Sequence, residues 1–294
     1  MSAGVELSRR AAALSVFGSL LFAQSDGRRV GRSSQEEARP NRWIVYYGNT
    51  EPIETFTRYP YVVFDSRYHP PVSSLSGQDR KIVGYLSLGE ASPDYEYFSE
   101  LESAGLLVRP SSTWLGNQYI DIRDSRWRRR VCDRLVPWVL EQGFDGVFFD
   151  TLDSPLAIEE SEPGRYAGMA EAAAALIREI RQSFPGIILM LNRSYKLLPL
   201  VEAHIDVAVA ESVYSTYDFD RKKYVKVSPD NYARQLTWLR DARIRRPELK
   251  IFTLDYCDAN DQAAIKEAYR VERQNGFWPY VTSIDLTTVV PEPS

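Results

Sequence analysis

The chain has 294 residues, which suits one large domain or two small ones and is long enough to bury a core without disulfides. A formal net charge of -4 and the lack of a long basic run argue against a nucleic-acid partner. Only two cysteines, without metal-ligand spacing, and two histidines are present, so we predict no metal and no other cofactor. We expect a monomer.

The first 23 residues resemble a secretory signal peptide. Arg9 and Arg10 precede an apolar stretch that ends at the small residue Ala23. The stretch is too short to predict a membrane span, and the alternative is a tail with a short apolar helix. We expect residues 1–23 to be removed and the protein to be secreted or periplasmic, with no membrane contact beyond this leader. Residues 24–41, rich in Ser, Arg, Glu and Gln, are predicted to form a linker.

Apolar runs of strand length alternate with helical patterns from Asn41 onward. Strands that are buried on both faces of a parallel sheet have this continuous apolar character. The eight predicted strands are Trp43–Tyr47, Tyr61–Asp65, Ile82–Leu88, Gly146–Asp150, Ile187–Asn192, Val207–Glu211, Ile251–Asp255 and Pro279–Ser283. The predicted helices between them are Ser125–Gln142, Gly168–Ser183, Asp230–Arg245 and Asn260–Asn275.

Eight strands with intervening helices favour a closed barrel over an open doubly wound sheet. No G-x-G-x-x-G or P-loop motif follows a strand, so the sequence does not support nucleotide binding. Residues 42–294 are therefore predicted to form one α/β domain, a (β/α)8 TIM barrel. The loop after the third strand, residues 89–123, is long enough to build a substrate groove.

Acidic residues gather where the predicted strands end. In (β/α)8 barrels the carboxyl ends of the strands line the active site. Five of six residues at these ends are acids, a concentration that randomly placed surface acids would not give. The six residues are Asp65, Glu90, Asp150, Asn192, Glu211 and Asp255.

Helix capping and metal binding are two alternative roles for these acids. Aspartate caps helix N-termini well, which could account for Asp65 and Asp153. Glutamate is a poor cap, so capping does not account for Glu211. A carboxylate-rich rim could also hold Mg²⁺ or Ca²⁺, although the chain has no D-x-D-x-D loop.

The fourth and sixth strands end in Asp150 and Glu211. Side chains from alternate strands point into the same layer of a barrel. This arrangement fits the roughly 5–10 Å between the two carboxyl groups of glycoside hydrolases, one of which is the acid and the other the nucleophile or base. Burial and the neighbouring like charge would keep one of the two protonated near neutral pH.

Four motifs follow one another along the chain: Gly84–Ala91 (GYLSLGEA), Trp114–Asn117 (WLGN), Gly143–Asp153 (GFDGVFFDTLD) and Ala210–Ser212 (AES). In this order they resemble the endo-α-1,4-polygalactosaminidase family of glycoside hydrolases, and the resemblance runs from about Trp43 to Ser283. It implies a TIM barrel that cuts galactosamine-containing exopolysaccharide. The family's catalytic pair maps onto Asp150 and Glu211. We predict Asp150 as the nucleophile, or as the base if the enzyme inverts, and Glu211 as the general acid, although either carboxyl group could be the protonated one.

A galactosamine polymer is cationic where it is deacetylated, and an acidic rim would favour it. Aromatic rings near the rim could stack on sugar faces. Two alternatives remain: a non-catalytic carbohydrate-binding barrel, which would lack the acid pair, and a metal-dependent deacetylase, which would need a His/Asp cluster. The residues predicted to bind substrate are Asp65, Tyr85, Glu90, Trp114, Asn117, Asp153, Asn192, Tyr214, Asp255 and Tyr256.

Overall fold

The computed structural model describes residues 41–75, 80–111 and 116–293. The predicted signal peptide, almost all of the predicted linker and Trp114 lie outside these residues. In the part of the chain that is described, no helix is both long and apolar enough to cross a membrane.

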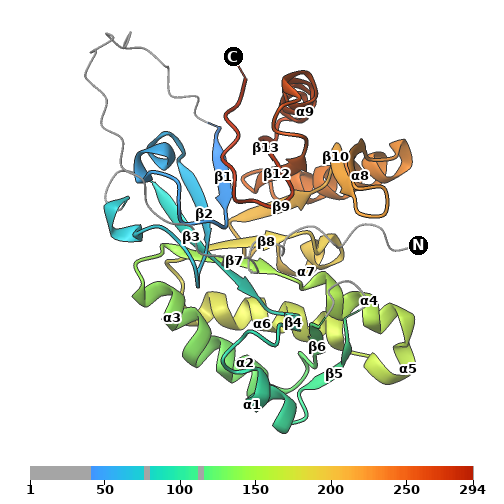
Figure 1. Ribbon diagram of the computed structural model, residues 1–294. Helices are drawn as coiled ribbons and strands as arrows, with labels where there is room; N and C mark the ends of the chain where they lie inside the picture. Colours follow the sequence, from blue (N-terminus) through green and yellow to red (C-terminus); the bar gives the residue numbers. More distant parts are fainter. Residues whose placement is uncertain (1–40, 76–79, 112–115, 294) are drawn as a thin grey trace.

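Eight parallel strands form a nearly closed barrel in the order β1-β2-β3-β7-β8-β9-β12-β13 (Figure 1). The indole nitrogen of Trp43 in the first strand donates to the carbonyl oxygen of Trp278 in the last at 2.8 Å, which joins the two ends of the sheet. The predicted TIM barrel is therefore confirmed, with strand ends that differ from the prediction by no more than one residue. The strands are β1 (Trp43–Tyr46), β2 (Tyr61–Asp65), β3 (Lys81–Ser87), β7 (Gly146–Asp150), β8 (Ile188–Asn192), β9 (Val207–Glu211), β12 (Lys250–Tyr256) and β13 (Trp278–Thr282).

Aromatic rings fill the barrel interior near the amino ends of the strands. Phe252 stacks on Trp278 with ring centroids 5.0 Å apart, and Tyr61 meets Phe252 edge-on at 5.1 Å. Truncation of one such buried ring to alanine typically destabilises a protein by about 3–5 kcal/mol. Because these rings close the barrel at the amino ends of the strands, a ligand can enter at the carboxyl ends.

The long helices pack against the outer face of the sheet, with α3 and α6 on one side and α8 and α9 on the other (Figure 1). The predicted helix over residues 125–142 is split by a π-helical segment, because Pro137 has no N–H to continue the ordinary α-helical ladder. The outer helices are α2 (Ser125–Arg130), η4 (Val131–Leu135), α3 (Val136–Glu141), α6 (Met169–Ser183), α8 (Pro229–Arg245) and α9 (Gln262–Gln274).

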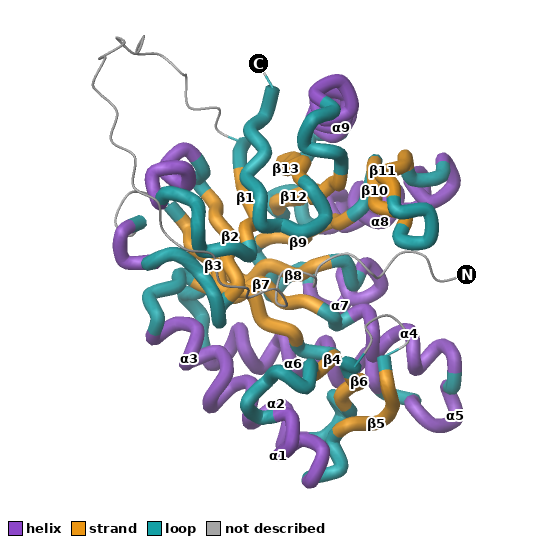
Figure 2. Tube along the Cα trace, viewed as in Figure 1, coloured by secondary structure: helices purple, strands orange, loops and turns teal. Residues whose placement is uncertain are grey.

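Two insertions extend the carboxyl-terminal side of the barrel, after β3 and after β9. Figure 2 shows the first, a small antiparallel sheet, beside α4 and α5. The second is the β10–β11 hairpin. The sequence predicted a long loop after β3 but not the strands within it, and it did not predict the hairpin. The remaining elements are β4 (Glu90–Ala91), β5 (Leu107–Pro110), β6 (Gln118–Ile120), β10 (Ser215–Asp218), β11 (Lys223–Lys226), α1 (Phe98–Ser103), α4 (Asp153–Ser161), α5 (Pro163–Tyr166), α7 (Leu198–Val201), η2 (Ile53–Arg58), η3 (Val72–Ser74) and η5 (Tyr195–Leu197).

Candidate active site

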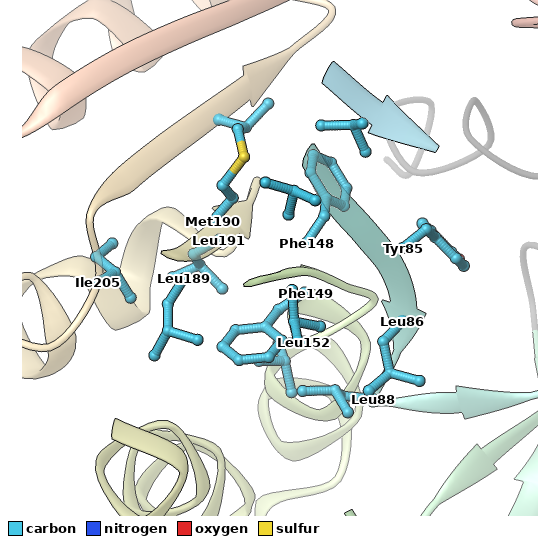
Figure 3. Close-up of a cluster of buried hydrophobic side chains, with 14 of the residues drawn as sticks. Tyr85, Leu86, Leu88, Phe148, Phe149, Leu152, Leu189, Met190, Leu191 and Ile205 are labelled. Atoms are coloured by element: carbon cyan, nitrogen blue, oxygen red, sulfur yellow. The ribbon is translucent and has the colours of Figure 1, made fainter. Parts of the chain in front are cut away.

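Three neighbouring strands, β7, β8 and β9, end in Asp150, Asn192 and Glu211. Phe148 is in register with Met190, and Asn192 is in register with Val209. Side chains alternate along a strand, so the three end residues point to the same side of the sheet as Phe148 and Met190. Figure 3 shows that side: Phe148 and Met190 project one way, whereas Phe149 and Leu189 project the other. The register therefore brings the three polar side chains together inside the barrel mouth.

Asn192 bridges the two predicted catalytic carboxylates. Its Nδ2 donates to Asp150 Oδ1 at 3.1 Å and to Glu211 Oε2 at 2.8 Å. Because both contacts share one nitrogen, these two oxygens are no more than about 5.9 Å apart. The pair is thus close enough to act on one glycosidic bond.

A tyrosine contacts the other oxygen of each carboxylate. The Tyr85 hydroxyl donates to Asp150 Oδ2 at 3.0 Å, and the Tyr256 hydroxyl donates to Glu211 Oε1 at 2.9 Å. Tyr85 and Tyr256 were predicted as substrate-binding residues. The structure places both, with Asn192, directly against the carboxylates, where they fix the direction of the two acids.

The backbone turns sharply after each of these strand ends. Thr151, Arg193 and Ser212 have φ of 68°, 57° and 57°, a region that side chains other than glycine seldom occupy. Strained backbone of this kind clusters at functional sites. Thr151 is held there by its hydroxyl, which accepts a hydrogen bond from Gly89 N at 2.8 Å. A Cβ at Gly89 would lie 2.0 Å from the Thr151 carbonyl oxygen, so this position requires glycine.

Burial raises the pKa of Glu211 above its usual value, and the negative charge of Asp150 raises it further. Arg193 and the hydrogen bonds from Asn192 and Tyr256 act in the opposite direction without reversing the shift. A carboxyl group with a raised pKa retains its proton toward neutral pH, as a general acid must. Glu211 is therefore the member of the pair suited to protonate a leaving group.

Arg193 is a site residue that the sequence analysis missed. Its Nε lies 3.6 Å from Asp153 Oδ2, an ion pair whose side chains are 16% and 22% exposed. Burial alone would lower the pKa of Arg193, but Asp153, Glu211 and Asp150 together raise it. The sequence did contain a signal for Arg193, because this cationic residue directly follows Asn192, the polar residue that ends β8. Asp153 is the first residue of α4, and its carboxylate forms an ion pair with Arg193 beside Asp150 and Glu211.

Asp65 lies at the same rim, because β2 and β3 align it with Tyr85. Its Oδ1 accepts the backbone N–H of Arg67 at 2.7 Å. Burial raises the pKa of Asp65, and the hydrogen bond and charge of Arg67 partly oppose this. No helix begins at the next residue, so the carboxylate orders the loop after β2 rather than capping a helix.

Glu90 and Asn117, two of the predicted substrate-binding residues, contact each other, and Glu90 also contacts Ser154 of α4. Glu90 is 0% exposed, with Ser154 Oγ at 2.5 Å from Oε1 and Asn117 Nδ2 at 3.4 Å from Oε2. Both carboxylate oxygens of Glu90 are therefore hydrogen-bonded within the protein, and its role in substrate binding stays a prediction. Glu90 joins β4 to β6 and to α4.

Asp255 lies outside the mouth, and Tyr214 contacts α8. In β12, Leu254 is in register with Glu211, so Leu254 and Tyr256 face inward and Asp255 faces outward. Tyr214 packs edge-on against Tyr232 of α8, with ring centroids 6.2 Å apart. The prediction that Asp255 binds substrate is wrong, because it counted strand ends without the alternation of side chains. Tyr214 follows the end of β9 by three residues, and its role in substrate binding stays a prediction.

In the described residues, no group of three or more His, Cys, Asp or Glu is arranged to hold a metal ion. The acid pair faces hydrogen-bond donors from Tyr85, Asn192 and Tyr256. We therefore expect hydrolysis to be unchanged after treatment with EDTA and removal of the chelated ions. Activity that is lost to EDTA and restored by one divalent cation would show that a metal completes the site.

Comparison with known proteins identifies the family of the chain. The family model of glycoside-hydrolase family GH114 matches residues 28–293. An uncharacterized protein of Deinococcus radiodurans is 27% identical over 221 residues, which are 73% of this chain and 68% of that protein.

Two solved structures share the fold. The glycoside hydrolase domain of PelA from Pseudomonas aeruginosa has a TM-score of 0.75 at 23% identity, and the match covers 85% of this chain and 98% of that one. Ega3 from Aspergillus fumigatus, solved in complex with galactosamine, has a TM-score of 0.64 at 14% identity, covering 90% of this chain and 99% of that one. Because the family match spans the whole described barrel, the chain belongs to glycoside-hydrolase family GH114 and is a glycosidase.

Proposed function

We propose that this protein hydrolyses α-1,4 linkages in a galactosamine-containing exopolysaccharide, with Asp150 and Glu211 as the catalytic pair. The observation that supports this most is the amide of Asn192 between the two carboxylates, which holds them at a separation suited to a single glycosidic bond. A purely carbohydrate-binding barrel would have no use for two buried acids bridged in this way.

The short separation favours a retaining mechanism. Retaining glycosidases hold their carboxyl groups about 5–5.5 Å apart, whereas inverting enzymes leave about 6.5–9.5 Å for a water molecule. The limit of about 5.9 Å applies to the two oxygens that Asn192 bridges; we propose the first class on this limit, and the anomer of the first product distinguishes the two classes. Asp150 would attack the anomeric carbon while Glu211 gives its proton to the leaving oxygen. Glu211, now ionised, would then take a proton from water as that water displaces Asp150.

Local charge supports an amino-sugar substrate. Asp65, Asp150, Asp153 and Glu211 lie at or near the mouth, and among them Asp153 is paired with Arg193. A surplus of carboxylates attracts the ammonium groups of deacetylated galactosamine. The galactosamine complex of the structurally similar Ega3 points to the same class of sugar.

Product analysis after incubation with partly deacetylated α-1,4-linked galactosaminoglycan tests this function. We expect shorter oligosaccharides with new reducing ends. Release of acetate without chain cleavage would support a deacetylase. Retention of the intact polymer on immobilised protein, without products, would support a binding protein.

We also propose that the protein is a monomer, without a structural argument for this state, and that it is exported, because the amino-terminal segment has the features of a cleavable leader. The exported protein should therefore begin close to residue 24. Mass spectrometry of the protein recovered outside the cytoplasm would detect this, and an intact Met1–Ala23 segment would contradict it.

A further inference from the structure

Two carboxylic acids are buried between the barrel and α9, behind the strand end that holds Glu211. Asp255 lies on the outer face of β12 and is 0% exposed. Glu272 lies on the inward face of α9, with Ile265, Ala268 and Tyr269, and is also 0% exposed. An acid at the core-facing position of an amphipathic helix is unusual, since burial of a charge without a partner is strongly unfavourable.

Asp255 holds the segment that follows Glu211. Its Oδ1 accepts the backbone N–H groups of Tyr214 at 2.7 Å and Ser215 at 2.9 Å. The next residue, Tyr256, donates its hydroxyl to Glu211 itself. The N–H of Ser212, whose φ is 57°, donates to the Leu254 carbonyl at 2.8 Å. Strand β12 therefore fixes both the side chain of Glu211 and the strained turn after it.

The amide of Asn275 is the polar group beside Glu272, and it lowers the pKa of Glu272 less than burial raises it. Within the described residues, Asp255 Oδ2 and both carboxyl oxygens of Glu272 are buried without a hydrogen-bond partner. Two ionised carboxylates in this position would repel one another with no cation to offset them. One proton between them supplies an O–H donor to an ionised acceptor, which is a strong hydrogen bond.

We propose that Asp255 and Glu272 share one proton as a buried acid pair, and that this acid pair is a positioning element that keeps Glu211 in its catalytic orientation. The first half rests on the burial of both acids, on their unpaired oxygens and on the effect of the Asp255 charge at Glu272. The second half rests on the proposed function, because it assigns Glu211 a role in catalysis.

Burial of the two acids sets the pH range over which the pair loses its shared proton. Burial, opposed by the backbone donors and supported by the charge of Glu211, raises the pKa of Asp255 to about 7. Burial, together with the charge of Asp255, raises the pKa of Glu272 to about 9. The folded state then binds a proton that the unfolded state releases above its ordinary glutamate pKa of about 4.3. The stability from this proton is complete below about pH 4.3 and is lost as the pH rises toward about 9.

The other titratable groups around the pair are Glu211 of β9, Tyr195 of η5, Tyr232 of α8 and Cys257 after β12. Asn275, at the end of α9, is the polar neighbour of Glu272. Burial raises the pKa of Tyr195, Tyr232 and Cys257. These three groups therefore stay neutral up to about pH 9 and do not contribute to the pH dependence of stability expected for the acid pair.

The substitution Glu272→Gln tests the shared proton without any substrate, because glutamine keeps an N–H donor for Asp255 but cannot titrate. We expect Tm of the wild-type protein to fall more steeply than Tm of E272Q between about pH 6 and 9. We also expect the infrared band of protonated carboxyl groups at about pH 8 to be stronger in the wild type than in E272Q, because Glu272 contributes to it in addition to Glu211. Glu267→Gln on the same helix is the matched control, since Glu267 is a half-exposed partner of Arg270. Equal pH slopes for wild type and E272Q, or an unchanged infrared band, would overturn the acid pair.

The positioning role is tested by the contrast between Glu272→Gln and Glu272→Leu, which fills the same space without a donor. We expect kcat of E272L to fall about 10- to 100-fold with KM unchanged, and kcat of E272Q to stay near the wild-type value. If E272L keeps wild-type kcat while its Tm changes, the pair is only structural. If the wild-type protein does not cleave the polymer at all, the proposed function fails, and the melting and infrared results still decide whether the acid pair exists.

Discussion

The substitution Asp150→Asn is expected to lower kcat by about 10³-fold or more, because an amide cannot form the covalent glycosyl intermediate that a carboxylate nucleophile forms. The fold should survive. Asparagine keeps the shape of the side chain, and its amide oxygen can still accept a hydrogen bond from Tyr85 or Asn192. Steady-state kinetics on the polymer, with thermal melting as the check on folding, measures both effects.

Asp153→Asn is the matched control for Asp150→Asn. Asp153 lies three residues further along the same motif, but its carboxylate pairs with Arg193 rather than with Asn192. We expect D153N to stay within about 10-fold of the wild-type rate. Near wild-type turnover in D150N together with an inactive D153N would make Asp153 the nucleophile. Azide added to Asp150→Ala should give a β-glycosyl azide, because the small anion attacks from the side of the missing carboxylate.

The substitution Glu211→Gln is expected to lower kcat by about 10²–10⁴-fold on the polymer, the range that general acid catalysis supplies. The pKa of Glu211 is raised chiefly by burial, so wild-type activity persists to higher pH than an ordinary glutamate would allow. Activity then declines as the pH rises through that pKa, because the ionised form has no proton to give to the leaving oxygen. Profiles of kcat/KM against pH should show this alkaline decline in the wild-type enzyme and not in E211Q.

A substrate with a good leaving group provides the control for Glu211, since its departure needs little protonation. The loss of rate in Glu211→Ala should be much smaller on that substrate than on the polymer. Added azide should then give an α-glycosyl azide, the opposite anomer to the product of Asp150→Ala. An alkaline decline that persists unchanged in E211Q would assign the acid to another residue.

The barrel was predictable because each strand is an apolar run that ends in a turn or a polar residue. Asp150, Asn192 and Glu211 were predictable for the same reason, as the last residues of their strands. Asp255 has the same apolar run before it, yet β12 continues for one more residue and the alternation of side chains turns Asp255 outward. Register between strands decides this, and a single sequence does not contain the register.

Insertions limited the prediction elsewhere. Glu90 follows β3 closely and looks like a rim acid in the sequence. In the structure it is the first residue of β4, within the antiparallel sheet of β4, β5 and β6, and it is completely buried. Strand β6, which pairs with β4, and strand β5, which pairs with β6, have no distinctive apolar run, so that sheet could not be anticipated. Arg193 and Glu272 interact with acids that are distant in the sequence, Asp153 and Asp255. Only the folded chain brings these groups together.

The anomeric configuration of the first product tests the catalytic account most directly. The two carboxylates bridged by Asn192 are close enough for double displacement, so an α-linked galactosaminoglycan should release a product that is α at its new reducing end before mutarotation. Proton NMR during the first minutes of hydrolysis observes this signal. Early accumulation of the α-anomer, followed by slow equilibration with the β-anomer, is the expected result. Early accumulation of the β-anomer, or no new reducing ends at all, would contradict Asp150 and Glu211 as a nucleophile and acid acting on one glycosidic bond.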